Sequence, residues 1–91
     1  MNTDTLLYNF GTETPMSEVF DSLGIAEIAT KAIHGPCRFR LDAHYVFDQE
    51  ARYCRIESIS EVGRHLATIF TALLTEQFGD DGFTVTRGRT R

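Results

Sequence analysis

Hydrophobic and polar residues alternate near the start of the chain. Over residues 5–10, Leu6, Tyr8 and Phe10 fall on one face of an extended segment. A period of two is the spacing of a half-buried strand, because successive side chains of a strand point to opposite faces. The pattern therefore predicts a short strand here.

Apolar residues then recur every three or four positions over residues 16–33, which is the period of an amphipathic helix. Pro15 suits the first helical turn, because its missing N–H costs nothing there. Gly35 and Pro36 end the pattern. Gly24 interrupts it, and the sequence leaves open whether this glycine kinks one helix or separates two.

The strictest alternation in the chain covers residues 37–48 and predicts one long strand. A four-residue turn and a second alternating segment over residues 52–57 complete a hairpin. A register in which Phe47 faces Arg52 places the apolar residues of both strands on one face. The hairpin therefore has one buried face and one face that meets water or a partner.

Ser58 and Glu61 fit a capping box at the start of a second helix, and residues 83–86 alternate as a last strand. The order β-α-β-β-α-β is typical of the ferredoxin-like sandwich, a four-stranded antiparallel sheet with two helices on one face. We therefore expect one α+β domain over residues 1–91, with residues 87–91 as a basic flexible tail.

The composition agrees with one globular domain. The 91 residues are 42% hydrophobic and 24% charged, which excludes the compositions of disordered and low-complexity chains. No apolar run approaches the roughly 20 residues of a membrane span, and the first residues lack the pattern of a signal peptide. These features predict a cytoplasmic protein with no membrane partner.

Charge is distributed unevenly along the chain. The protein has 9 Lys and Arg against 13 Asp and Glu, a formal net charge of −4. Arg87, Arg89 and Arg91 lie at the C-terminal end, so residues 1–86 carry −7. Because a phosphate backbone must be neutralised by Lys and Arg, this acidic body argues against nucleic-acid binding. The three terminal arginines are the candidate residues of a nucleic-acid alternative.

Both cysteines, Cys37 and Cys54, are expected on the buried face of the hairpin. In the predicted register Cys54 lies opposite Tyr45, which is about 26 Å along the strand from Cys37. A disulfide requires Cα atoms within roughly 7 Å, so this register excludes one. Neither cysteine has another Cys or His at metal-ligand spacing. The sequence therefore predicts two buried, unreactive thiols.

The open face of the hairpin is the main candidate site, because it gathers charged and aromatic side chains on a surface that the helices leave uncovered. Arg and Tyr are enriched at the energetic centres of protein interfaces. The expected partner-binding residues are Arg38, Arg40, Asp42, His44, Val46, Tyr53, Arg55 and Glu57.

Two chemistries fit this face. Asp42, His44 and Glu57 have the groups to bind a divalent metal, or to place a carboxylate pair beside a general base. The same residues also fit a charged ladder, in which Arg40 and Arg55 offset the neighbouring carboxylates. The ladder is favoured, so we expect no metal, no cofactor and no catalytic residue.

RNA-binding folds of this topology stack bases on aromatic residues of the same face. Here Tyr53 is the one aromatic residue placed firmly on it, and residues 52–57 lack the glycine–aromatic signature of such folds. Nucleic-acid binding is therefore kept as the alternative hypothesis.

These patterns favour a small, non-enzymatic, protein-binding regulator, inhibitor or accessory subunit that acts through its exposed sheet face. A homodimer through that face is another way to cover it. An inhibitor encoded by a mobile element, such as an anti-CRISPR protein, is one concrete form. Two alternatives stay open: a nucleic-acid-binding module that uses the hairpin face and the arginine tail, and a metal- or ligand-dependent sensor or enzyme.

Overall fold

The computed structural model describes residues 3–90, without the side chains of Thr3, Arg89 and Thr90. Along this part of the chain the elements are β1 (Thr3–Phe10), α1 (Met16–His34), α2 (Pro36–Asp42), β2 (Tyr45–Asp48), β3 (Tyr53–Glu57), α3 (Glu61–Phe78) and β4 (Phe83–Thr90). None of the helices in these residues is both long enough and apolar enough to cross a membrane.

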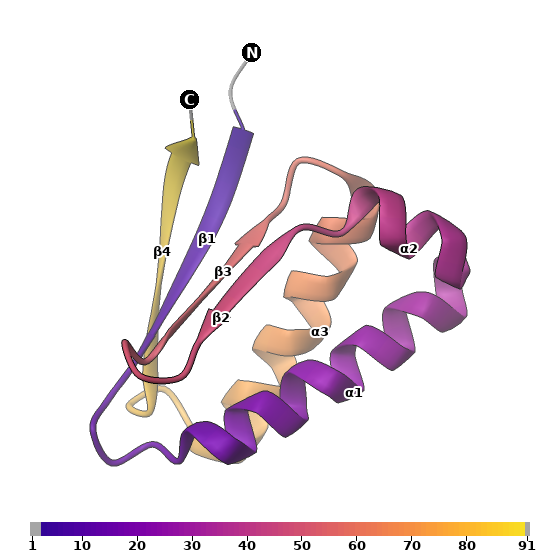
Figure 1. Ribbon diagram of the computed structural model, residues 1–91. Coiled ribbons are helices and arrows are strands. Elements are labelled where there is room, and N and C mark those ends of the chain that lie inside the picture. Colours follow the sequence, from indigo (N-terminus) through magenta and orange to yellow (C-terminus); the bar gives the residue numbers. More distant parts are fainter. Residues whose placement is uncertain (1–2, 91) are drawn as a thin grey trace.

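The four strands form one antiparallel sheet in the order β2-β3-β1-β4. The helices α1 and α3 lie along the same face of this sheet, and α2 connects the end of α1 to the start of β2 (Figure 1). No described helix covers the opposite face (Figure 1). The predicted α+β class and the four-stranded antiparallel sheet are confirmed, whereas α2 was not predicted.

The core lies between the sheet and the two long helices, and Tyr8 of β1 is at its centre. This residue is completely buried, and its ring packs edge-on against Phe70 of α3 with the centroids 5.0 Å apart. Its hydroxyl shares a 2.7 Å hydrogen bond with the hydroxyl of Thr71 and lies 3.3 Å from the carbonyl oxygen of Ala67. Burial raises the pKa of Tyr8 to about 12.

The helix α3 begins in close contact with the end of β3. Ser60 caps the helix by accepting a 2.9 Å hydrogen bond from the backbone N–H of Gly63, so the cap lies two residues after the predicted Ser58. A Cβ atom on Gly63 would come within 2.1 Å of the carbonyl oxygen of Glu57. The close contact between α3 and β3 therefore requires glycine at this position.

The prediction of one strand over residues 37–48 is wrong. The first half of that segment is α2, and β2 is only Tyr45–Asp48. Pro36 stands in the first turn of α2, where its fixed φ favours a helix. One turn along, the guanidinium of Arg38 forms an ion pair with Asp42 at 3.0 Å, a contact that only helical spacing allows.

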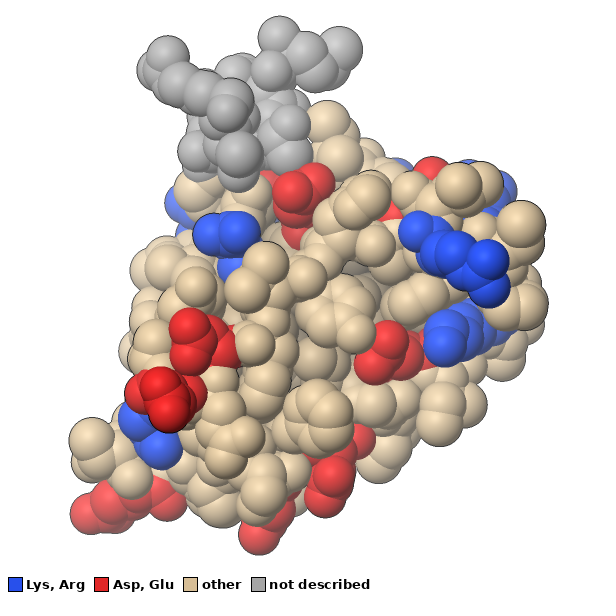
Figure 2. Space-filling view, viewed as in Figure 1, with Lys and Arg blue, Asp and Glu red and all other residues tan. Residues whose placement is uncertain are grey.

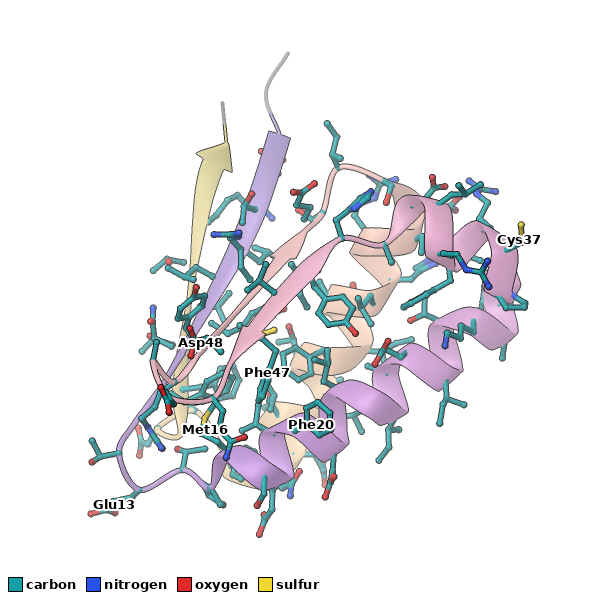
Figure 3. The ribbon with its side chains drawn as sticks, viewed as in Figure 1. Glu13, Met16, Phe20, Cys37, Phe47 and Asp48 are labelled. Atoms are coloured by element: carbon teal, nitrogen blue, oxygen red, sulfur yellow. The ribbon has the colours of Figure 1, made fainter. Side chains whose placement is uncertain are left out.

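The short helix also explains the burial of its apolar residues. In α2, Cys37 and Leu41 share one face and are exposed, while Phe39 on the other side is buried. The ammonium of Lys31 lies 5.2 Å from the centre of the Phe39 ring. Cys37 lies at the outer end of α2 (Figure 3), so the prediction that this thiol is buried is wrong.

The predicted hairpin register is wrong by two residues. Phe47 lies opposite Cys54 and Tyr45 opposite Ile56. A shift by an even number of residues keeps every side chain on its predicted face, because side chains alternate with a period of two. The burial of Cys54 is therefore confirmed although its partner across the strands is not the predicted one.

The hairpin tip is fastened to the loop that follows β1. Arg52, in the turn between β2 and β3, has a φ of 61°, which is in the left-handed region. Its guanidinium donates hydrogen bonds to the carbonyl oxygens of Gly11 and Thr14. The side chain thereby satisfies two loop carbonyls and fixes how the hairpin meets the start of α1.

The last strand is longer than the predicted residues 83–86. The backbone of residues 87–90 continues the antiparallel pairing of β4 with β1. These residues therefore form part of the sheet edge in place of a separate tail. The side chain of Arg89 and the whole of Arg91 lie outside the described residues.

The first helix, α1, runs without a break through Gly24, which answers the question that the sequence left open. The apolar residues after this glycine do not all join the core. Ile25, Ile28 and Ile33 are exposed, although the spacing suggested that they continue the buried face.

Two glycine-to-alanine substitutions are expected to have opposite effects. Gly63→Ala should lower the free energy of unfolding by about 1–3 kcal/mol, because the new methyl group collides with the backbone of β3. Gly24→Ala should raise it by about 0.5–1 kcal/mol, since the methyl group meets nothing within 4 Å and alanine favours a helix. Urea unfolding followed by circular dichroism measures both. Equal effects of the two substitutions would contradict the contact between α3 and β3.

Candidate functional site

The open face of the sheet carries side chains from all four strands. The pairing of β1 with β3 places Arg55 beside Leu7 and Tyr53 beside Asn9, on the side away from the helices. On β2, Val46 lies opposite Arg55 and is 40% exposed. The same face is completed by His44, Asp48, Glu57, Thr5, Thr84 and Thr86.

Five of the eight residues predicted for partner binding lie together at the β2 side of this face. They are His44, Val46, Tyr53, Arg55 and Glu57. The carbonyl oxygen of His44 accepts a hydrogen bond of 2.9 Å from the backbone N–H of Glu57, which holds the start of β2 against β3. We call these five residues the hairpin patch.

A hollow of about 330 Å³ lies at the hairpin patch. Its walls are formed by Ala43, His44, Tyr45, Val46, Arg55 and Glu57. A cation, a carboxylate, an imidazole and an aliphatic side chain therefore surround one depression. Such a mixture suits a protruding side chain of a protein partner, because it offers both charge pairing and apolar contact.

Tyr45 of β2 borders the hollow, but its side chain points to the helix side of the sheet and contacts α1. Its hydroxyl donates a hydrogen bond of 2.9 Å to a carboxylate oxygen of Glu27 on α1. Burial, and after it the hydrogen bond and the charge of Glu27, raise the pKa of Tyr45 to about 12. The neighbouring ring of Phe47 packs against Phe20 of α1 with centroids 5.4 Å apart (Figure 3).

The remaining three predicted residues are not on the sheet. Arg38, Arg40 and Asp42 belong to α2. Basic side chains gather over α2 and the adjoining end of α1 in the space-filling view (Figure 2). The predicted register, with Phe47 facing Arg52, would place Asp42 opposite Glu57. Instead Asp42 lies in α2 and forms an ion pair with Arg38.

Arg87 and the hairpin patch lie on opposite faces of the sheet. Arg87 is the cross-strand neighbour of Leu6, which packs against the core on the helix side. Arg55 is the neighbour of Leu7, on the open side. Arg87 instead lines a separate hollow together with Asp4 and Arg64. A nucleic acid bound to the open sheet face would therefore contact the hairpin patch without contacting Arg87 on the same face.

No three His, Cys, Asp or Glu side chains among residues 3–90 come together in a way that could hold a metal ion. Asp42 is directed to Arg38, and its backbone carbonyl accepts a hydrogen bond from the Ser60 hydroxyl at 2.9 Å. The helical fold of α2 thus directs Asp42 to Arg38, while His44 and Glu57 lie together in the hairpin patch.

A histidine pair between the long helices was missed by the sequence analysis. Nε2 of His34 on α1 and Nδ1 of His65 on α3 are 2.6 Å apart, and the rings are stacked with centroids 4.8 Å apart. One ring must donate and the other accept in this contact. The two residues are 31 positions apart in sequence, and no local pattern joins them.

Comparison of the chain with protein-family models, with curated proteins and with solved structures finds no match.

Thiol labelling tests the helical placement of residues 36–42. In the native protein Cys37 should react rapidly with a thiol reagent, because it is exposed on α2. Cys54 should not react, because burial raises its pKa to about 12 and the thiolate is the nucleophile. Mass spectrometry should find one label on the native chain, two on the unfolded chain and none on native Cys37→Ala. Two protected thiols in the native wild type would support the long strand that the sequence predicted.

The contact between Tyr45 and Glu27 has an expected pH dependence. The pKa of Tyr45 is raised from 10.0 to about 12 in the folded protein, so the stability that this phenol contributes is complete below pH 10 and is lost as the pH approaches 12. NMR titration of ring-labelled tyrosine should show the high midpoint in the wild type and a lower one in Glu27→Gln. An identical midpoint in both proteins would mean that burial alone causes the shift.

Proposed function

We propose that this chain is a small, non-enzymatic regulator that binds another protein through the open face of its sheet. It acts as an inhibitor or an accessory subunit in the cytoplasm. The hairpin patch supplies the central contacts, and α2 stands beside it at the edge of the sheet. The observation that carries the proposal is the uncovered face with an exposed valine next to an exposed arginine.

The composition of the hairpin patch supports a protein partner. Val46 offers an apolar surface, and Tyr53 a rigid aromatic ring. Arg55 offers a charged guanidinium with five N–H donors. Residues of these last two types contribute most to measured binding energies. Glu57 and His44 beside them add polar groups that set the register of a partner.

We also infer that the chain adopts the ferredoxin-like arrangement, with α2 as an insertion between the first helix and the second strand. The strand order β2-β3-β1-β4 and the position of both long helices on one face support this inference. In such an arrangement the other sheet face is the natural binding surface, because the fold itself leaves it uncovered.

The nucleic-acid alternative is less well supported. It requires the terminal arginines and the hairpin face to act together, and Arg87 lies on the other side of the sheet from Arg55. The alternative of a sensor or enzyme has only the hollow beside His44 and Glu57 in its favour. In a homodimer formed through the sheet face, the hairpin patch would contact a second copy of this chain.

Affinity capture with matched variants tests the proposal. A tagged chain is incubated with lysate of its own host, and captured proteins are quantified by mass spectrometry after nuclease treatment. Val46→Glu and Arg55→Ala should each reduce a stoichiometric protein partner about tenfold or more, as truncation of a central interface residue does. Arg40→Ala is the matched control, because it removes one exposed arginine from α2 and leaves the sheet unchanged.

Two outcomes would overturn the proposal. Partner capture that is equal for Arg55→Ala and wild type would remove the hairpin patch from the interface. Capture that disappears with nuclease would mean that the chain was retained through nucleic acid.

A further inference from the structure

The helix α1 has a second apolar surface that the core does not use. On the core side, Val19, Leu23 and Ala26 are almost completely buried. On the outer side, Ile25 is 55% exposed and Ile28 is 70% exposed. Large aliphatic side chains that are clustered and exposed on a helix mark a surface that another molecule covers.

The spacing of this outer surface is that of a helix-pairing seam. Ile25, Ile28 and Ala32 follow one another by three and four residues, and Asp21 and Glu18 continue the same row toward the N-terminus. Steps of three and four residues place side chains in one narrow row, as in the contact seam of two packed helices. The small side chain of Ala32 allows a second helix to approach closely. We call this row the α1 stripe.

The charges at the two ends of the α1 stripe have opposite sign. Glu18 and Asp21 lie at its N-terminal end, and Lys31 lies in the last turn of α1, at the other end. In the space-filling view, basic side chains lie over α2 and the adjoining end of α1, while acidic side chains lie toward the beginning of α1 (Figure 2). An antiparallel copy of the same helix would therefore bring acidic groups against basic groups at both ends.

We propose that a second copy of this chain binds antiparallel to the α1 stripe and forms a two-fold symmetric dimer. In a two-fold interface the same residues face one another from both copies, so a surface must be complementary to itself. An apolar centre with oppositely charged ends satisfies this condition.

A lipid surface fits the α1 stripe less well. Helices that lie on membranes carry Lys and Arg beside their apolar face, which attract anionic lipid. The α1 stripe carries Glu18 and Asp21 at its N-terminal end, and Lys31, near its other end, is the one Lys or Arg of α1. An acidic flank is repelled by such a membrane and is attracted by the basic end of a second copy.

Sedimentation velocity of the full chain tests the dimer. The wild type should pass from the 10.3 kDa monomer to a species of twice that mass as concentration is raised about a hundredfold. Ile28→Gln should weaken association at least about tenfold. This side chain is 70% exposed, so its replacement should leave the circular dichroism spectrum unchanged, and the melting temperature unchanged at concentrations where both proteins are monomeric.

A charge exchange tests the antiparallel orientation. Asp21→Lys and Lys31→Glu should each weaken the dimer, and the double variant should recover most of the lost affinity, because the opposite charges are then restored in exchanged positions. Loss of the contact between Lys31 and Phe39 does not produce such a recovery.

A control on the open sheet face separates this dimer from the proposed partner binding. Val46→Gln should leave self-association unchanged, since Val46 is on the open face of the sheet and α1 lies along the other face (Figure 1). A wild type that stays monomeric at every concentration would overturn the proposal. So would a dimer that Val46→Gln abolishes and Ile28→Gln leaves intact, because it would place the contact on the sheet face.

Discussion

The buried phenol of Tyr8 determines how the layers of this protein are joined. It lies on β1, one of the two inner strands of the sheet, packs against Phe70 and hydrogen-bonds with Thr71 of α3. A buried hydroxyl without a partner is costly, so this contact fixes both the position of the helix and the face of the sheet that it covers. Everything on the other face, including Arg55 and Val46, is consequently left for water or for a partner.

Strands and helices that bury only one of their faces could be predicted from the sequence. The alternation through Leu6, Tyr8 and Phe10 identified β1, because only one side of this strand meets the core. The same reasoning failed for residues 37–42, since alternating apolar residues over one or two turns also fit a short helix with one buried residue. The hairpin register was two residues off for a related reason: an even shift leaves the pattern of faces unchanged.

The candidate site was predictable only where it lies on a regular strand. The positions of Tyr53, Arg55 and Glu57 followed from the alternation of β3, whereas Arg38 and Arg40 were misplaced together with α2. The histidine pair between α1 and α3 depends on how two helices pack, which no local spacing encodes. The exposed isoleucines of α1 were visible as an apolar pattern, but periodicity alone does not say which of two apolar faces enters the core.

We propose that a protein partner binds the hairpin patch on the open sheet face. Hydroxyl-radical footprinting of the free chain and of its purified complex tests it most directly, because oxidation reports the exposure of individual side chains. Val46 and Tyr53 should be protected in the complex, while Val85 on the helix side of β4 should be oxidised equally in both. Unchanged oxidation of Val46 and Tyr53 in a stoichiometric complex would contradict it.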